Sequence, residues 1–257
     1  MYDILKGILS DRREGELFTC FCSWHIILIA LVVAAIVLLC YVMKNKGADF
    51  RKRVLDLTCG AAFGLYMLDF FLMPFAYGAI EIEKLPFHAC TFTCLICFLS
   101  RHSEFFSQFR RPIAVIGFIS NLCYLVYPAG IMWSAVEPFT YRAIQTLGFH
   151  AIMVIYTFLA IVYDEKIKFE WKKIYEELIV LCFMAVWSLL GNHLYSGVYP
   201  TYTVEYNWFF TRTDPFGILP PSVAPFVTVG AFFAACAVIF AVYFGIRALI
   251  LKKNAKK

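Results

Sequence analysis

The sequence predicts an all-α membrane protein, a bundle of about seven transmembrane helices with its N-terminus outside and its C-terminus inside. Three observations predict this fold. Hydrophobic residues make up 61% of the chain and charged residues 16%, against about 25% in ordinary soluble domains. Apolar runs long enough to cross a bilayer recur along the chain. Lys and Arg gather in alternate connections between those runs. The composition excludes a soluble enzyme, a disordered chain, a nucleic-acid-binding protein and a disulfide-stapled secreted module.

Seven segments approach the roughly 20 apolar residues that a bilayer-crossing helix needs. The first is too long for the apolar core of a cleavable signal peptide, so we expect it to stay in the membrane. The third begins at Pro86, a residue suited to the first turn of a helix, and the fourth ends near Pro128. These two spans are the shortest. In chain order, the predicted spans are residues 18–43, 54–77, 86–100, 112–126, 143–163, 174–195 and 223–251.

The basic residues orient these spans. Of the 23 Lys and Arg residues, 17 lie after the first, third and fifth spans or at the C-terminal end, from Arg247 onward. The other six lie in the N-terminal segment and after the second, fourth and sixth spans. Because positive charge collects on the inner side of a membrane, this alternation supports seven spans with the C-terminus inside. The net charge of +5 is therefore mainly a signal of topology rather than of a nucleic-acid partner.

Two segments outside the spans have recognisable patterns. Apolar residues at helical spacing within residues 1–17, among them Tyr2 and Leu9, predict an interfacial helix, with a frayed tail as the alternative. Residues 196–222 are rich in Tyr, Phe and Pro and form an aromatic outer loop. The ten Cys lie mostly within apolar runs, so we expect free, buried thiols. We expect residues 1–257 to form a single integral membrane domain.

The few ionisable and amide side chains inside the spans fall at similar depths. At 1.5 Å per residue, His25 lies roughly 10 Å below the outer end of its helix, and Asp69 and His150 roughly 12 Å below theirs. Four more polar residues lie within roughly 6 Å of an outer end. Buried ionisable groups within a membrane are costly and are functional candidates. The predicted outer polar layer consists of His25, Asp69, His88, Cys90, His150, Asn192 and His193.

Cys90 is the strongest chemical candidate in this layer. It lies near the start of the helix that begins at Pro86, where the positive end of the helix dipole favours a thiolate. A histidine from another helix would complete an activated nucleophile, and His150 is placed to do so. His88 stands two residues before Cys90 and points elsewhere in a regular helix, so it is the weaker base.

Structural explanations compete at each position. His25 would donate a hydrogen bond to a neighbouring backbone carbonyl, Asp69 would pair with a His or Tyr, and His193 would be wetted at the interface. Asn121 in the fourth span is an interhelical hydrogen-bonding candidate. A zinc site formed by His25, His88 and His150 is a further alternative. No HExxH or paired CxxC motif supports a metal, and we expect no cofactor.

Several short motifs, spread over most of the chain, carry a family resemblance. The most specific is the step Leu85-Pro86-Phe87-His88-Ala89-Cys90. With it the sequence resembles the YwaF-like family of bacterial integral membrane proteins, and the eukaryotic transmembrane protein 164 acyltransferases look like distant relatives of that family. The supporting motifs are Leu17-Phe18 through Ser23-Trp24-His25, Phe149-His150, Gly191-Asn192, Tyr206-Asn207-Trp208, Asp214-Pro215 and Phe216-Gly217.

The resemblance implies a seven-span bundle and a phospholipid acyltransferase that uses a Cys nucleophile and a His base. Cys90 would hold the acyl group and His150 would be the base. We expect the substrate to be a membrane phospholipid or lysophospholipid in the outer half of the cell membrane. Its headgroup phosphate would meet cations at the outer surface. The candidates are Lys84, Arg142 and Arg212.

Two other functions remain open at this point. One is a non-enzymatic transporter, receptor or accessory membrane protein whose histidine layer binds a ligand or protons. The sequence has no paired broken helices in two matching halves, the arrangement typical of many transporters. The other is a metal-dependent intramembrane lipid hydrolase. The sequence does not indicate an oligomeric state.

Overall fold

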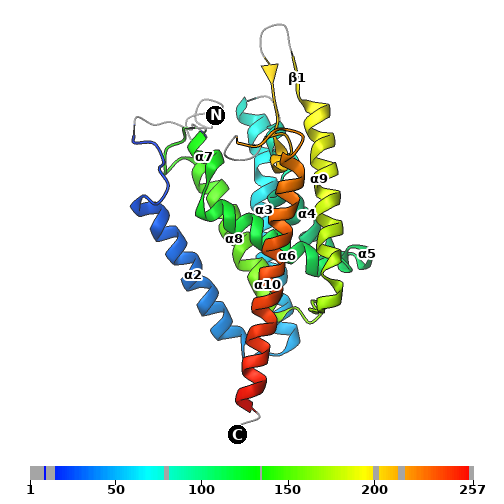
Figure 1. Ribbon diagram of the computed structural model, residues 1–257. Coiled ribbons are helices and arrows are strands. Elements are labelled where there is room, and N and C mark those ends of the chain that lie inside the picture. The colour runs from blue at the N-terminus through cyan, green and yellow to red at the C-terminus, as the bar shows by residue number, and fades with distance from the viewer. Residues whose placement is uncertain are drawn as a thin grey trace.

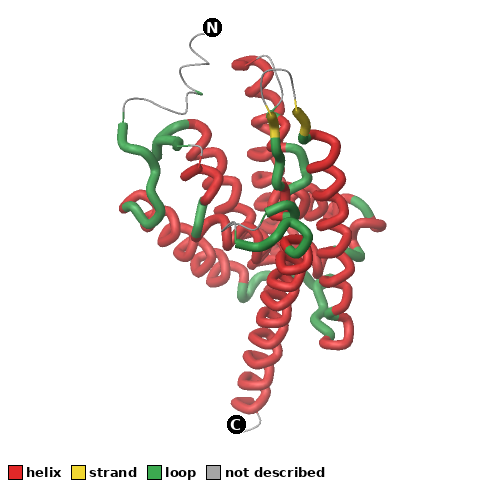
Figure 2. The backbone as a smooth tube through the Cα atoms, turned by 45° about the horizontal axis from the view of Figure 1, so that its top comes forward, coloured by secondary structure: helices red, strands yellow, loops and turns green. Residues whose placement is uncertain are grey.

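The computed structural model describes residues 9, 15–77, 81–133, 135–198, 203–213 and 218–254. Their helices pack side by side in one bundle, with α2 at its edge (Figure 1). Most helices run along the long axis of the bundle (Figures 1 and 2). The helices are α2 (Ser23–Met43), α3 (Ala48–Tyr77), α4 (Ala89–His102), α5 (Glu104–Ser107), α6 (Arg110–Val126), α7 (Ala129–Trp133), α8 (Tyr141–Tyr163), α9 (Tyr175–Tyr195) and α10 (Ala224–Asn254).

Shorter elements connect these helices. Three are single 3₁₀ turns, which are common connectors between longer elements. The other two are two-residue strands that pair antiparallel, with Gly197 opposite Val204, beyond the end of α9. The sequence predicted only an irregular aromatic loop there, so this hairpin is an addition. The elements are η1 (Ile82–Lys84), η2 (Trp171–Lys173), η3 (Trp208–Phe210), β1 (Gly197–Val198) and β2 (Thr203–Val204).

The predicted helical membrane bundle is confirmed. Six helices among the described residues are long and apolar enough to cross a membrane, and each corresponds to a predicted span. The predicted third span is the helix α4, which has only 14 residues. At 1.5 Å per residue it is roughly 21 Å long, less than the roughly 30 Å of a bilayer's hydrocarbon core. The chain is thus a multi-pass membrane protein. The predicted count of about seven spans is close to the six long helices among the described residues, with α4 as the shorter one.

The core of the bundle lies around α6 and α8. In each of these helices 56% of the most apolar window is buried, against 11% in α2 and in α10. The two outer helices are apolar on nearly every face, as expected of helices that face lipid. The more amphipathic α4 turns its buried face, with Cys94 and Cys97, toward the core. The described cysteines are free thiols, as predicted, but only four of the ten are buried, and Cys123 and Cys182 are exposed on the surface of the bundle.

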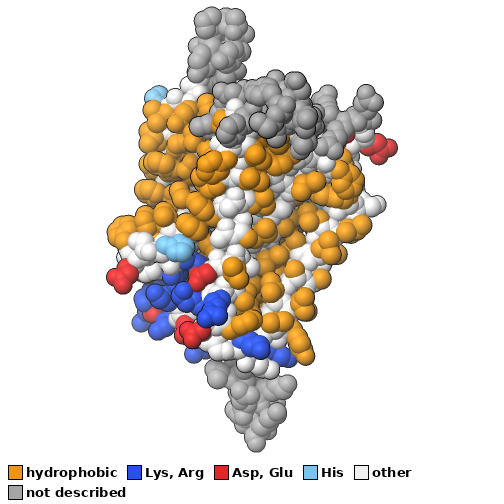
Figure 3. Space-filling view, turned by 180° about the vertical axis from the view of Figure 1, so that it is seen from behind, with side chains coloured by type: hydrophobic (Ala, Val, Ile, Leu, Met, Phe, Trp, Pro, Cys, Tyr) orange, Lys and Arg blue, Asp and Glu red, His pale blue; other side chains and the backbone are white. Residues whose placement is uncertain are grey.

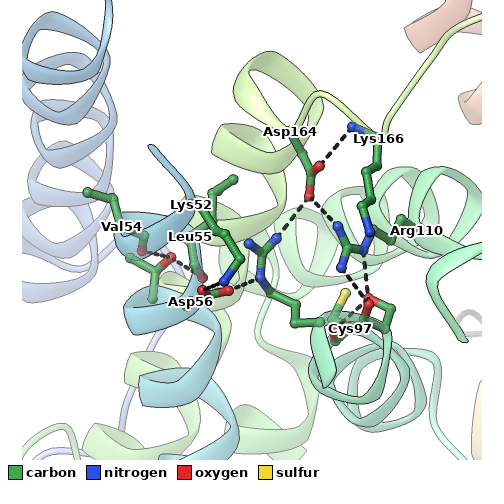
Figure 4. Close-up of polar contacts among 11 residues, drawn as sticks. Lys52, Val54, Leu55, Asp56, Cys97, Arg110, Asp164 and Lys166 are labelled. Carbon is green, nitrogen blue, oxygen red and sulfur yellow. Dashed lines mark hydrogen bonds and ion pairs between the residues drawn. The ribbon is translucent and has the colours of Figure 1, made fainter. Parts of the chain in front are cut away.

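Charged side chains gather at the end of the bundle where α2 ends and α3 begins, beside a broad hydrophobic band (Figure 3). Asp164, just after α8, lies between two arginines (Figure 4). Its Oδ2 is 2.9 Å from Nη1 of Arg101 and 3.4 Å from Nη1 of Arg110. Arg101 also pairs with Asp56 of α3. These ion pairs join α3, α4, α6 and the end of α8 on the side predicted to face the cytoplasm.

Two predicted segments fall partly outside the described residues. The interfacial helix predicted for residues 1–17 is covered only at residues 9 and 15–17, so it stays a prediction. The predicted outer loop, residues 196–222, is described except for residues 199–202 and 214–217. Its central part folds back over the bundle as η3. Which side of a membrane this end faces also stays a prediction.

Candidate functional site

Cys90 lies in the first turn of α4, close to a helix N-terminus as predicted. The helix begins at Ala89 and not at Pro86, the predicted first residue, and His88 precedes it with extended backbone angles. The side chain of Cys90 is half-buried and lies within hydrogen-bonding reach of Ser120 on α6. The positive partial charge at the N-terminal end of a helix favours a thiolate at this position, whereas burial of the side chain favours the neutral thiol.

His150 is held by a neighbouring amide. Its Nδ1 lies 2.8 Å from Oδ1 of Asn121, and both side chains are buried. The Asn121 amide nitrogen donates to the carbonyl of Gly117 over 2.7 Å, so the Asn121 oxygen is the acceptor for His150. Nδ1 of His150 therefore carries the proton. In a neutral imidazole this leaves the lone pair on Nε2, the form that a general base requires.

Tyr124 packs against the ring of His150. Its ring stacks on the imidazole with centroids 3.9 Å apart and planes 18° apart. Tyr124 is one turn from Ser120 and Asn121 on α6, so this helix contacts both Cys90 and His150. Within the described residues no hydrogen bond joins Cys90 directly to His150. We call these five residues the Cys–His site: Cys90, Ser120, Asn121, Tyr124 and His150.

The segment before Cys90 is fixed by α9. Nε1 of Trp187 donates to the carbonyl of Pro86 over 2.8 Å, and the Ser188 hydroxyl donates to the carbonyl of Phe87. The Phe87 ring lies against the backbone at Gly191, where a Cβ atom would come within 2.5 Å of it. A glycine is therefore required at this contact. This packing role of Gly191 was not among the predictions from the sequence, in which the Gly191-Asn192 motif only supported the family resemblance.

The turn η3 closes over the same segment. The backbone N–H of Phe209 points to Nδ1 of His88 over 3.3 Å, which makes that nitrogen an acceptor. Asn192 holds the turn, since its Oδ1 accepts from the N–H of Trp208 over 2.9 Å and its Nδ2 donates to Thr211 over 2.8 Å. Asn192 thus fixes the turn that covers His88. Neither residue contacts Cys90 through a hydrogen bond in the described part of the chain.

His25 makes structural contacts at both ring nitrogens. Nε2 lies 2.7 Å from the carbonyl of Leu125, and Nδ1 accepts from the N–H of Phe21 over 3.0 Å. The side chain is fully buried. This geometry matches the structural explanation given for His25, in which its ring donates a hydrogen bond to a neighbouring backbone carbonyl. His25 thus contacts the end of α6 at Leu125, and within the described residues no hydrogen bond joins it to the Cys–His site.

Asp69 belongs to a separate polar group. Its Oδ2 forms an ion pair with Lys84 at 3.0 Å, and its Oδ1 accepts a hydrogen bond from Tyr141 over 2.7 Å. Nζ of Lys84 also reaches Oε1 of Gln145 at 3.5 Å. Asp69 is 2% exposed, whereas the Lys84 side chain is 19% exposed. Lys84, a predicted headgroup contact, is therefore partly neutralised by Asp69.

The other predicted outer cations differ in their partners. Nη1 of Arg142 is ion-paired with Glu81. Arg212 donates to the carbonyl of Asn192 over 3.0 Å, and within the described ranges no carboxylate lies within ion-pair distance of it. His193 is exposed on the last turn of α9, which matches the alternative of an interfacial histidine. Arg212 is consequently the outer cation that is best placed to meet an external anion.

The proposed metal ligands are not assembled into one site. The described residues contain no group of three or more His, Cys, Asp or Glu side chains that could hold a metal ion. His25 contacts α6 at Leu125, whereas His88 contacts η3 and His150 contacts Asn121. The three histidines thus take part in three different contacts.

Compared with models of protein families, with characterised proteins and with solved structures, the chain has no significant match in any of the three. The resemblance to the YwaF-like family is carried by the sequence motifs alone and stays a prediction.

Proposed function

We propose that the protein is a phospholipid acyltransferase that uses Cys90 as nucleophile and His150 as base. The observation that carries the proposal is the hydrogen bond of His150 to Asn121. It fixes the imidazole in the form with a free lone pair on Nε2, beside the helix that also contacts the Cys90 thiol. A thiol, an imidazole and an amide that orients it form the same chemical set as in Cys-His-Asn hydrolases.

The reaction proceeds in two steps. His150 Nε2 accepts the proton of the Cys90 thiol, and the sulfur attacks the ester carbonyl of a phospholipid. The ester C–O bond breaks, a thioester forms, and the imidazolium returns its proton to the oxygen of the departing lysophospholipid. In the second step an acceptor hydroxyl loses its proton to Nε2 and its oxygen attacks the thioester carbonyl. The C–S bond breaks, and the imidazolium returns the proton to the sulfur, which regenerates the thiol. No cofactor or oxidant is needed for this balance.

The surroundings of the site suit a lipid ester. The site lies within a chain whose helices are apolar enough to span a membrane, so an acyl chain would approach it laterally from the bilayer. Arg212, at the outer end of α9, lacks a described carboxylate partner and is our candidate for the headgroup phosphate. Lys84 and Arg142 act chiefly within the protein, because each forms an ion pair with a carboxylate of α3 or of the connection that follows it. We place the enzyme in the cell membrane.

The other functional hypotheses have less support. A ligand-binding or proton-relaying histidine layer needs histidines that share one site, but His25 uses both ring nitrogens for backbone contacts, and His25, His88 and His150 take part in three different contacts. A metal-dependent lipid hydrolase needs a ligand cluster, and the described residues do not provide one. The contacts of the Cys–His site support a specific chemistry, acyl transfer through a thioester on Cys90.

The test is to trap the thioester. Purified protein in nanodiscs is incubated with a phospholipid carrying a labelled acyl chain, and labelled protein is measured before and after neutral hydroxylamine, which cleaves thioesters. We expect labelling in wild type, none in Cys90→Ser, and normal labelling in Cys182→Ser, an exposed thiol of α9. Acyl turnover in Cys90→Ser equal to that of wild type, or labelling that persists in this variant, would show that the proposal is wrong.

A further inference from the structure

Helix α2 is attached to the bundle at its two ends. At the outer end, Nε2 of His25 contacts the carbonyl of Leu125 at 2.7 Å. At the inner end, the hydroxyl of Tyr163 donates to the carbonyl of Cys40 over 3.0 Å. Between these contacts the helix lies beside α8 at the edge of the bundle (Figure 1), and its Val32 packs with Leu125 of α6 and Val154 of α8. These two hydrogen bonds therefore attach the ends of α2 to the bundle, while the middle of the helix is only partly buried.

A groove of about 200 Å³ lies between these attachments, bounded by α2, α6 and α8. Its lining consists entirely of Ile, Val, Leu and Phe side chains. Val32, Leu125 and Val154 form a buried floor, and Val33, Leu122 and Val126 are exposed at the rim. The groove is thus apolar throughout and open along one side.

We propose that this groove binds one acyl chain of a bilayer lipid. The three helices that form it are all candidate membrane spans, so the space opens toward hydrocarbon and not toward water. An apolar lining offers no hydrogen-bonding partner to hold a water molecule. A flexible hydrocarbon chain fills such a space and buries the floor residues.

The groove does not suit a partner helix. Close contacts between helices in membranes depend on small residues such as Gly, Ala and Ser. None of the lining residues is of this kind, and the rings of Phe118 and Phe158 lie 6.0 Å apart in one wall. The composition of the groove therefore favours a single acyl chain over a partner helix.

The acyl-chain site is independent of acyl transfer. Its lining residues lie on the side of α6 that faces α2, whereas Cys90 contacts Ser120 on the side that faces α4. A lipid can occupy the groove whether or not Cys90 reacts. The two proposals are therefore tested by different measurements, thioester formation for one and lipid contact for the other.

The experiment uses the full chain in nanodiscs that contain a trace of phosphatidylcholine with a photoreactive diazirine in the middle of one acyl chain. After irradiation, labelled peptides are identified by mass spectrometry. We expect labelling concentrated on α2, α6 and α8 at the groove. Leu122→Trp and Val33→Trp, which place an indole at the rim, should lose this labelling. Leu189→Trp, a lipid-facing leucine of similar exposure on α9, should keep it.

Each outcome decides the proposal. The two rim positions are exposed, so both variants should elute as folded protein like wild type. Labelling spread over all lipid-facing helices in proportion to their exposure would mean that the groove holds no particular chain. Labelling that survives both rim substitutions would contradict the proposal equally. A photoreactive amino acid placed at position 33 that crosslinked to a second protein chain would assign the groove to a partner helix, and this result would also overturn the proposal.

Discussion

Phe87 packs so closely on the backbone of Gly191 that no larger residue fits at position 191. A Cβ atom built there lies 2.5 Å from two atoms of the Phe87 ring. The ring is also stacked on Trp187, with centroids 5.1 Å apart, and lies 4.9 Å from the ring of Trp208. The contact fixes the residue that stands three positions before Cys90, so it links α9 to the start of α4.

Replacing this glycine should destabilise the protein. In Gly191→Ala the new methyl group must displace the Phe87 ring, and overpacking of this kind costs about 1–3 kcal/mol of unfolding free energy. Gly60→Ala is a matched control, because Gly60 is also within a helix and a Cβ there meets nothing within 4 Å. The measurement is the unfolding free energy of each variant in detergent. Equal stabilities of the two variants would contradict the tight contact, and Phe87→Leu should partly restore Gly191→Ala.

Removing the amide partner of His150 should impair its action as a base. Asn121→Ala frees the imidazole to rotate and to change tautomer, and general-base catalysis contributes roughly 100-fold or more to a rate. We expect acyl transfer to fall by up to that factor while Cys90 remains in place. Nitrogen NMR of labelled histidine should show His150 protonated at Nδ1 in wild type and a mixture of tautomers in the variant. An unchanged spectrum would mean that Asn121 does not orient His150.

The helices could be predicted from the sequence more readily than their ends. Hydropathy detects the part of a helix that lies in the bilayer, so the predicted second span began at residue 54. The helix α3 begins at Ala48, since Arg51 and Lys52 are good helix formers although they are charged. The third span was predicted from a short apolar run, and α4 is correspondingly short. Composition thus predicts the bundle, while helix ends depend on local propensity.

The candidate site could be predicted only in part. Depth along a helix follows from counting residues, and it placed His25 and His150 in the same half of the membrane. The rotation of each helix depends on packing, which the sequence does not reveal. His25 contacts Leu125 at one end of α6, and His150 contacts Asn121 one turn earlier. The role of Gly191 had a signal, a glycine within an apolar span, which often marks close packing of helices.

Two neighbouring glutamates on α9 should respond differently to neutralisation. Arg111 and Glu177 form a buried pair, Nε to Oε1 at 2.9 Å, with side chains 7% and 0% exposed. Glu177→Gln leaves the guanidinium buried with one charged partner fewer, and breaking such a pair costs about 3–5 kcal/mol. Glu176 contacts the same Arg111 over 2.8 Å but is 35% exposed, so Glu176→Gln should cost less than about 1 kcal/mol.

Unfolding free energies of these two variants measure the difference. The comparison is matched because both changes replace a glutamate with glutamine on one helix turn and both affect the same arginine. Equal losses would mean that burial does not govern the pair. Arg111→Met combined with Glu177→Gln should be less destabilising than Glu177→Gln alone, since no charge then remains in the buried pair and the Glu176 carboxylate, which loses its partner, is partly exposed.

His25 should affect stability and not chemistry. His25→Ala removes the contacts to Leu125 and to the N–H of Phe21, and it leaves the Leu125 carbonyl without this partner in a buried setting. An unsatisfied buried polar group costs about 1–3 kcal/mol, so the unfolding free energy should fall by at least that amount. His193→Ala is the control, because His193 is exposed on α9 and its loss should leave stability within about 0.5 kcal/mol of wild type. Thioester formation at Cys90, measured per folded molecule, should be unchanged in both variants. A His25→Ala protein that folds with wild-type stability but forms no thioester would make His25 part of the reaction and not an attachment of α2.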